Sequence, residues 1–247
     1  MLALAVICMA ASCAKEGPNG AQGIPGPYFT GAIGGHVSLY DQYGSQVLGG
    51  LKSVNLVLEG SSTANPSNIY PDTNGLYSFS PVTTGNYSIT ANDPGYAYTV
   101  LNGIQFVSGM INVDIKLSQI PVFSATAFTA AKATASLNDS LVISFAPDTR
   151  ARNCIIFVNS VATGTDTASP PGYLLAYKKA IAANDSSETL LVPAQDLYNL
   201  GFISGSMVYY SEFSYVINDR SVYEDTVTGQ QVYYAVSHPK LDSAQAP

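Results

Sequence analysis

The sequence has few of the side chains that carry out most enzyme chemistry. It contains two histidines, His36 and His238, three cysteines and no tryptophan in 247 residues. A zinc peptidase needs a cluster of His and Glu ligands, and neither histidine is followed by a nearby glutamate. A nucleophile with a histidine base would depend on the same two residues. We therefore expect no catalytic residue, no metal site and no cofactor, and we expect that the protein is not an enzyme.

Cysteine is equally scarce in the body of the chain. Cys8 and Cys13 lie close to the N-terminus, so the remainder contains only Cys154. A single thiol cannot form an internal disulfide or a cysteine-based zinc site. Cys154 lies in an apolar run, which predicts a small buried core residue. The alternative, a reactive thiol, would need a basic neighbour such as Arg150 or Arg152.

Charged residues make up only 11% of the chain, and the formal net charge is −7. An acidic chain without a Lys/Arg cluster lacks the electrostatic features of a nucleic-acid-binding protein. Ser, Thr, Asn, Gly and Tyr supply the polar surface between regularly spaced turn signals. This composition is typical of extracytoplasmic all-β domains, and the length allows two of them.

Paired carboxylates, as in glycoside hydrolysis, are harder to exclude, because any two strands could bring two of them together. The candidates are Glu212, Asp219, Glu224 and Asp225. Most of these residues lie near predicted turns, where acidic side chains are usually solvated. The sequence therefore favours a surface role for them.

The clearest pattern in the chain runs from Pro71 to Tyr96. Residues 72–75, Asp-Thr-Asn-Gly, supply turn chemistry, and the apolar residues that follow alternate with polar ones in two short runs. The alternating apolar residues are Tyr77, Phe79, Tyr87, Ile89 and Ala91. This pattern predicts two half-buried strands between turns. Asp72, Asn74 and Gly75 also resemble the start of a calcium loop, but the closing glutamate of that motif is missing.

The N-terminal segment indicates export. Residues 1–12 are apolar and then small, which is typical of a signal peptide and too short for a membrane-spanning helix. Residues 10–13, Ala-Ala-Ser-Cys, resemble a bacterial lipobox, which implies cleavage before Cys13 and acylation of that residue. No Lys or Arg precedes the apolar run, so a plain signal peptide or an apolar segment of the fold stays open as an alternative. Acylation would attach the protein to a membrane.

Residues 13–30 form a predicted tether with glycine at positions 17, 20, 23 and 26. This Gly/Pro-rich stretch is too short for a collagen triple helix and predicts an extended spacer. Lys15-Glu16 resembles the short charged export signals of surface lipoproteins in the Bacteroidetes group. We expect an outer-membrane lipoprotein of the cell envelope, with surface exposure as the favoured placement.

Residues 31–118 are predicted to form the first domain, and two blocks in it resemble a known family. The first block is Asp-Thr-Asn-Gly-Leu-Tyr-Ser-Phe at 72–79, and the second is Gly-Asn-Tyr-Ser-Ile-Thr at 85–90. Their order and spacing resemble the carboxypeptidase regulatory-like domain. The resemblance implies a seven-stranded, transthyretin-like sandwich that serves as an accessory module without activity of its own.

Residues 119–124 are a predicted connector, residues 125–240 a second β-sandwich, and residues 241–247 a tail. Strands are expected at 141–147, 155–158, 173–177, 188–192, 207–217 and 230–237, with a short helical turn at 193–198. The block Leu141 to Pro147, with Phe145 where tryptophan is usual, resembles the fibronectin type III and immunoglobulin-like folds. The expected fold class is therefore all-β, with two sandwiches in tandem.

Seventeen tyrosines raise the possibility of sugar binding, because aromatic faces stack on the apolar faces of sugars. Most tyrosines alternate along strands and are expected in the core. Two adjacent pairs differ, because neighbouring residues of a strand face opposite sides, so one of each pair should be exposed or lie under a loop. The candidate ligand-binding residues are Tyr209, Tyr210, Tyr233 and Tyr234.

Together, these features predict a non-enzymatic cell-envelope lipoprotein that displays β-sandwich modules for binding a ligand or partner. The alternative is a carbohydrate-binding lipoprotein of a glycan-uptake system. The expected partners are the membrane, through the acylated Cys13, and either a polysaccharide or a protein, the latter bound by strand addition at an open sheet edge. The identity of the ligand, the oligomeric state, the membrane leaflet and the true start of the chain stay open.

Overall fold

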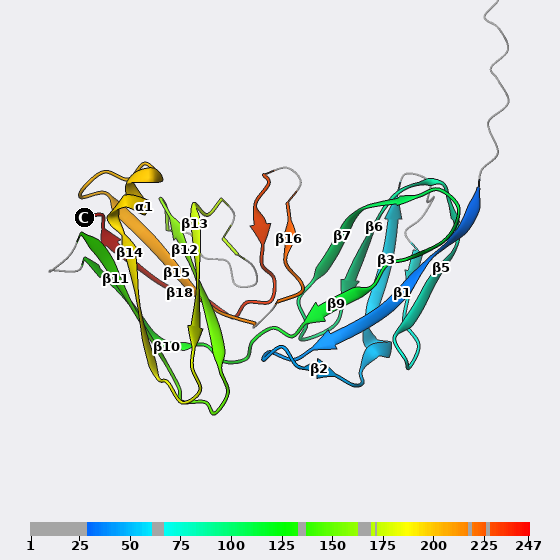
Figure 1. The fold of residues 1–247 in the computed structure, drawn as a ribbon, viewed down its shortest axis with the longest axis horizontal. Coiled ribbons are helices and arrows are strands. Elements are labelled where there is room, and N and C mark those ends of the chain that lie inside the picture. The colour runs from blue at the N-terminus through cyan, green and yellow to red at the C-terminus, as the bar shows by residue number, and fades with distance from the viewer. Residues whose placement is uncertain are drawn as a thin grey trace, which may run out of the picture.

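The computed structural model describes residues 29–60, 67–132, 137–162, 169–170, 172–216, 219–225 and 228–247. Within these ranges the chain is almost entirely β, which confirms the predicted fold class (Figure 1). Cys8, Cys13 and the predicted signal peptide lie outside the described residues, as does all of the tether before Phe29.

Within the described ranges, the first sandwich contains nine strands and a 3₁₀ turn. The strands are β1 (Thr30–Tyr40), β2 (Gln46–Val47), β3 (Asn55–Gly60), β4 (Ser67–Ile69), β5 (Leu76–Thr83), β6 (Gly85–Asn92), β7 (Thr99–Phe106), β8 (Gly109–Asn112) and β9 (Ile115–Ser118), and the turn is η1 (Leu51–Ser53). One sheet has the order β4-β3-β6-β7, and the other joins β2, β1 and β5, with β8 and β9 also pairing with β1. The two sheets enclose a single apolar core.

The central stretch forms the two strands that its alternation predicts. Tyr77 and Phe79 on β5 and Tyr87 and Ile89 on β6 are all buried. The turn before β5 is built by Asp72, whose Oδ1 accepts the backbone N–H groups of residues 74 and 76 at 2.8 and 2.9 Å. Gly75 in this turn has φ +83°, and a Cβ there would lie 2.6 Å from a backbone carbonyl oxygen of β1. The segment is therefore an Asx turn whose aspartate is occupied by backbone groups.

The chain after β7 pairs with β1 in two short strands. β8 and β9 both pair with β1 in parallel, and the change from one to the other occurs at Val113. At this point the N–H of Val113 donates to the carbonyl of Gly34 at 2.7 Å. A Cβ on Gly35 would lie 2.1 Å from the carbonyl oxygen of Val113, so the close approach requires glycine.

The second sandwich contains the remaining elements. These are β10 (Ala125–Lys132), β11 (Asn138–Phe145), β12 (Arg152–Asn159), β13 (Leu175–Ile181), β14 (Ser187–Pro193), α1 (Ala194–Asn199), β15 (Met207–Tyr215), β16 (Tyr223–Glu224), β17 (Gln231–Val232) and β18 (Lys240–Gln245). One sheet has the order β10-β11-β14, and the other β13-β12-β15-β18. The fully buried Cys154 belongs to the core between them, as predicted. Burial raises the pKa of its thiol well above the usual value.

The prediction that residues 241–247 form a tail is wrong. Residues 240–245 form β18, which pairs with β15 from Met207↔Gln245 to Glu212↔Lys240 and completes the sheet. The expected closing strand at 230–237 is reduced to the two residues of β17, which pair only with β16 in a small hairpin. The misassignment arises because β18 has a mostly exposed, polar sequence and lacks the apolar alternation that identifies a core strand.

β15 is buried on both of its faces. Val208 and Tyr210 face the sandwich core. Phe213 and Tyr215 face outward, into a second apolar cluster with Phe157, where Tyr233 and Val236, from the chain after β17, cover them. The segment between β15 and β18 therefore acts as an extra layer on the outer face of this sheet. Figure 1 shows its β16 hairpin standing between the two sandwiches.

The two sandwiches meet at a joint on both sides of the connector, residues 119–124. On one side, the Tyr43 hydroxyl donates to Asp148 at 2.7 Å, and the Arg150 guanidinium lies 3.3 Å from the centre of the Tyr43 ring. The hydrogen bond from Tyr43 lowers the pKa of the Asp148 carboxyl. The ring of Phe123, in the connector, stacks with Tyr43 at 6.0 Å. This side is therefore held by polar and cation–π contacts.

The middle and the other side of the joint are more buried. The Ser118 N–H donates to the Ser221 hydroxyl, and the Arg220 N–H donates to the Ser118 hydroxyl, both at 3.0 Å. Beyond them, the Tyr234 ring contacts Tyr98 edge-to-face at 5.8 Å. Buried alanines and a valine from both sandwiches fill the space beneath: Ala97, Val216 and Ala235. Contacts on two sides of the connector oppose rotation about it.

Replacing Tyr43 with alanine is expected to weaken the coupling of the two sandwiches. The change removes the hydroxyl bond to Asp148 and the cation–π contact with Arg150, which hold this side of the joint together. Calorimetric unfolding of Tyr43→Ala should show two more widely separated transitions than the parent chain. Tyr70→Ala, at an exposed tyrosine of the first sandwich, is the control. An unchanged separation in Tyr43→Ala would contradict a coupling role for this contact.

Candidate functional site

The structure places the four candidate tyrosines in four different environments. Tyr210 faces the core of the second sandwich, is 1% exposed, and donates its hydroxyl to Asp139. Tyr209, the adjacent residue on β15, is partly buried on the opposite, outer face. Burial and the neighbouring carboxylate both raise the pKa of Tyr210. Tyr210 is therefore a core residue, and Tyr209 is the member of the pair that lies toward the surface.

Both tyrosines of the second pair pack against other aromatic rings. Tyr233 is buried in the outer cluster, with its ring 5.7 Å from those of Phe157 and Tyr215. Tyr234 is partly buried in the joint, stacked with Tyr223 at 5.6 Å. The candidates therefore do not converge on one site, and neither member of either pair is fully exposed.

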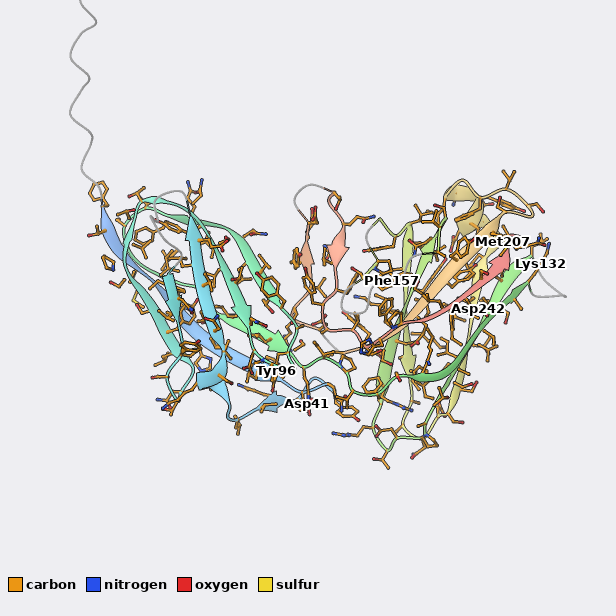
Figure 2. The ribbon with its side chains drawn as sticks, turned by 180° about the vertical axis from the view of Figure 1, so that it is seen from behind. Asp41, Tyr96, Lys132, Phe157, Met207 and Asp242 are labelled. Carbon is orange, nitrogen blue, oxygen red and sulfur yellow. The ribbon has the colours of Figure 1, made fainter. Side chains whose placement is uncertain are left out.

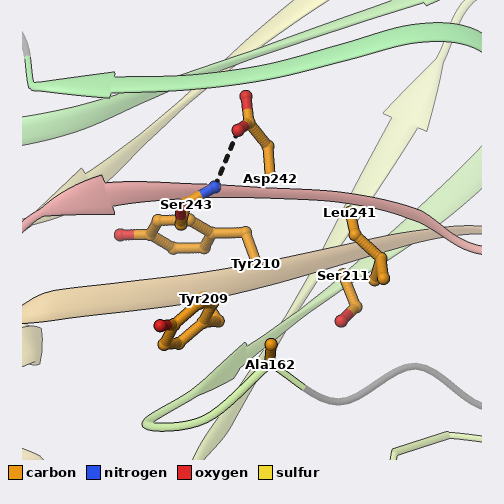
Figure 3. A pocket seen from close by; sticks show the side chains of 7 residues that line it. All are labelled: Ala162, Tyr209, Tyr210, Ser211, Leu241, Asp242 and Ser243. Atoms are coloured by element: carbon orange, nitrogen blue, oxygen red, sulfur yellow. Dashed lines mark hydrogen bonds between the residues drawn. The ribbon is translucent and has the colours of Figure 1, made fainter.

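Tyr209 borders a hollow of about 180 Å³ on the outer face of the β15–β18 ladder (Figure 3). The lining residues come from these two strands and from the chain that follows β12: Ala162, Tyr209, Tyr210, Ser211, Leu241, Asp242 and Ser243. Figure 3 shows the Tyr209 and Tyr210 rings on opposite sides of the β15 ribbon. The outer layer that covers Phe213 and Tyr215 does not line this end of the sheet.

Among the described residues that line the hollow, there is no cationic side chain and one carboxylate, that of Asp242. Asp242 is already engaged at both oxygens. Oδ1 accepts the N–H of Ser243 and Oδ2 accepts the N–H of Ala130 on β10, each at 2.8 Å. Asp242 therefore ties the edges of the two sheets together. The other side chains of the lining are aromatic, aliphatic and hydroxyl groups.

The catalytic alternative of paired carboxylates is not favoured by the geometry. Glu212 lies on β15, is fully buried, and has no hydrogen-bond partner for either oxygen among the described residues. Burial raises the pKa of Glu212 to about 8. Burial also raises the pKa of Asp219, which lies near the joint and accepts the Ser221 N–H. Glu224 is exposed on β16, and Asp225 accepts bonds from Thr228 within its own turn.

The two histidines lie apart from each other and from these carboxylates. The backbone N–H of His36, on β1, donates to Asp114 at 3.0 Å, and its ring faces the Ser38 hydroxyl at 3.3 Å. His238 is exposed beside the connector, where it lines a hollow of about 390 Å³ together with residues 120–124, Val236 and Ser237. Across the described ranges, no group of three or more His, Cys, Asp and Glu side chains could hold a metal ion.

Several residues that shape these sites gave no signal in the sequence. Tyr43 is 105 residues from Asp148 along the chain, and only the docking of the sandwiches brings Tyr43 to Asp148 and Arg150. Asn159, at the end of β12, is 2% exposed, and its Nδ2 has no acceptor among the described residues. None of the helices in the described part of the chain has the length and hydropathy needed to cross a membrane.

Comparison with known proteins gives only distant matches. No family model matches the sequence, and no curated protein does. Among solved structures, a proposed carbohydrate binding protein from Bacteroides uniformis shows 13% identity and a TM-score of 0.30, covering 86% of this chain and 98% of its own. DUF3823 family proteins from Parabacteroides merdae and Bacteroides ovatus each show 14% identity, with TM-scores of 0.26 and 0.29. They cover 87% and 88% of this chain, and 100% of their own chains. Similarity this low assigns neither a family nor a ligand.

Proposed function

We propose that this chain is a non-enzymatic lipoprotein of the cell envelope, anchored through Cys13, which holds its second sandwich away from the membrane for binding. The arrangement of the two sandwiches is the observation that supports the proposal. β1 begins at the end of the first sandwich that is farthest from the joint, and the second sandwich extends in the opposite direction (Figure 1). An anchor that precedes Thr30 would therefore place the second sandwich outermost.

The contacts at the joint would keep the second sandwich in this outermost position. A flexible connector would let the second sandwich fold back toward the membrane, whereas contacts on both sides of residues 119–124 fix its direction. The hollow beside Tyr209 lies in the outer part of that sandwich. Figure 2 shows Met207 and Asp242 on the side away from Asp41 and Tyr96, which mark the joint end of the first sandwich.

Metabolic labelling with radioactive palmitate tests the anchor. The full-length chain, expressed in a related bacterium, is expected to take up label, and Cys13→Ala is expected to lose it. Cys8→Ala is the matched control, because Cys8 lies within the predicted signal peptide and would be removed on cleavage. Protease treatment of intact cells then reports the leaflet, and removal of the protein from the cell surface is the expected result. Equal labelling of the parent and Cys13→Ala, or no labelling of either, would disprove the anchor.

A second candidate function, carbohydrate binding, is favoured by one observation. The described lining of the hollow beside Tyr209 combines an aromatic ring, an aliphatic side chain and two serine hydroxyls, without a cationic side chain. Aromatic walls with a few polar groups are typical of small-molecule sites.

A further inference from the structure

The end of the first sandwich that lies farthest from the joint forms a small apolar tip. This tip consists of three described segments that meet there: residues 29–31, 83–86 and 105–110. Three large apolar side chains of the tip are exposed, Phe29 at 56%, Val107 at 57% and Met110 at 69%. Figure 1 shows β1 beginning at this end, so the tip is also where the predicted tether joins the fold.

The three side chains are held in adjoining segments by the fold itself. The N–H of Thr84 donates to the carbonyl of Phe29 at 3.1 Å, and its hydroxyl donates to the carbonyl of Val107 at 2.7 Å. The strand that carries the third side chain, β8, approaches β1 so closely that a Cβ on Gly31 would clash with the carbonyl oxygen of Gly109. The tip is therefore a built part of the sandwich.

The distribution of charge sets this end of the sandwich apart. The three segments of the tip contain no charged side chain. Glu59 of β3 lies opposite Ser88 of β6, further along the sheet. Charged residues lie between the strands at the opposite end, which Asp41 marks in Figure 2: Asp41, Lys52, Asp72 and Asp93. Exposed apolar side chains scattered singly are ordinary, whereas several together without charge mark a contact surface.

The chain that precedes the tip indicates what this surface meets. Residues 14–28 join Phe29 to Cys13, the predicted site of acylation. Even when fully extended, a chain of this length keeps the tip within ~55 Å of the residue that carries the lipid. A short linker raises the effective concentration of the surfaces at its two ends to roughly the millimolar range, so a weak contact is sufficient. The membrane is therefore the apolar partner closest at hand.

We propose that the tip lies on the lipid surface, with Phe29, Val107 and Met110 at the boundary between the headgroups and the acyl chains. The inference goes beyond the proposed anchor and rests on it for the position of the tip. Because the tip contains no Lys or Arg, the contact does not depend on anionic lipid. The tether and the tip together hold the first sandwich end-on, and the joint then directs the second sandwich away from the membrane.

Tryptophan fluorescence in lipid vesicles tests the proposal, because the chain contains no tryptophan of its own. The full chain with Cys8→Ser is coupled through the Cys13 thiol to a maleimide lipid in phosphatidylcholine vesicles, and the fully buried Cys154 does not react. Met110→Trp in this chain is expected to lose about half or more of its emission when the acyl chains are brominated. Leu48→Trp is the matched control and should keep its emission, because Leu48 is 92% exposed and follows β2, at the joint end of β1.

Phe29→Ser with Val107→Ser, added to the Met110→Trp chain, separates an apolar contact from mere tethering. Quenching should fall by about threefold or more, because the remaining apolar area is small. The melting temperature should stay unchanged, because both side chains are exposed. Vesicles of phosphatidylglycerol should quench Met110→Trp as strongly as those of phosphatidylcholine.

Four results would overturn the contact between the tip and lipid. They are no quenching of Met110→Trp, equal quenching of Met110→Trp and Leu48→Trp, quenching in phosphatidylglycerol alone, and dimerisation that shields the tryptophan of Met110→Trp from brominated lipid. The last result would assign the tip to a second copy of the chain. Coupling to a maleimide lipid does not require acylation in the cell, so a failed anchor, seen by palmitate labelling, and a failed tip contact are distinguishable.

Discussion

Deleting residues 240–247 is expected to unfold the second sandwich and leave the first one folded. The deletion removes β18, and with it the backbone ladder to β15 that runs from Met207↔Gln245 to Glu212↔Lys240. β15 would then become an edge strand next to an open core. An edge strand that loses its partner exposes a row of unpaired backbone groups.

The deletion also removes three tertiary contacts. Ala244 and Ala246 are buried in the core, at 6% and 0% exposure. Asp242 holds the Ala130 N–H of the opposite sheet, and the carbonyl of Pro247 accepts the Tyr198 hydroxyl at 2.7 Å. Lost packing, lost hydrogen bonds and an opened sheet edge all act against the roughly 5–15 kcal/mol by which domains are usually stable. By contrast, removing an unpacked tail would leave the free energy of unfolding almost unchanged.

Limited proteolysis and far-ultraviolet circular dichroism measure this outcome. The truncated chain should give a protease-resistant fragment that ends near the connector, at residues 119–124, and should lose about half of its β signal. Leu241→Ser with Gln245→Ala is the matched control, because these side chains of β18 are exposed. A truncated chain that melts in the second sandwich at the parent temperature would contradict the assignment of β18 as a structural strand.

Replacing Glu212 with leucine is expected to stabilise the second sandwich at neutral and alkaline pH. Glu212 is fully buried in β15 between Ile156 and Lys240 of the neighbouring strands, and neither carboxylate oxygen has a partner among the described residues. A buried carboxyl without hydrogen bonds is destabilising, and replacing buried ionic groups with apolar ones often gains about 1–4 kcal/mol.

The same residue predicts the direction of the pH dependence. Burial raises the pKa of Glu212 from 4.5 to about 8 in the folded protein, so the folded state keeps a proton that the unfolded state releases. The stability from this group is fully present below about pH 4.5 and is lost as the pH rises to about 8. The loss is on the order of 4 kcal/mol across that window.

Urea unfolding at a series of pH values, followed by tyrosine fluorescence, measures this slope. Glu212→Gln keeps the shape of the side chain and cannot titrate, so its stability should change much less between pH 5 and about 8 than that of the parent. Glu224→Gln, at an exposed position of β16, should keep the parent slope. The same steep slope in Glu212→Gln as in the parent would show that another group carries the dependence.

The all-β class and the two central strands of the first sandwich, β5 and β6, follow from local sequence. Tyr77, Phe79, Tyr87 and Ile89 alternate with polar residues, and a strand buried on one face leaves that period of two in the sequence itself. The Asx turn at residues 72–75 is equally local, because its aspartate bonds to backbone groups two and four residues ahead. Such features depend on neighbours along the chain, so the sequence alone was sufficient to predict them.

The remaining features depend on partners that are distant along the chain. β18 carries little apolar alternation, because it is an edge strand whose place is set by its ladder with β15. Phe213 and Tyr215 differ from ordinary solvent-facing positions only because the chain after β17 folds back over them. The joint, the unpaired Glu212 and the hollow beside Tyr209 were likewise decided by the tertiary structure, because each needs strands that are dozens of residues apart to meet. Sequence alternation identifies which face of a strand is apolar, whereas only packing decides what covers it.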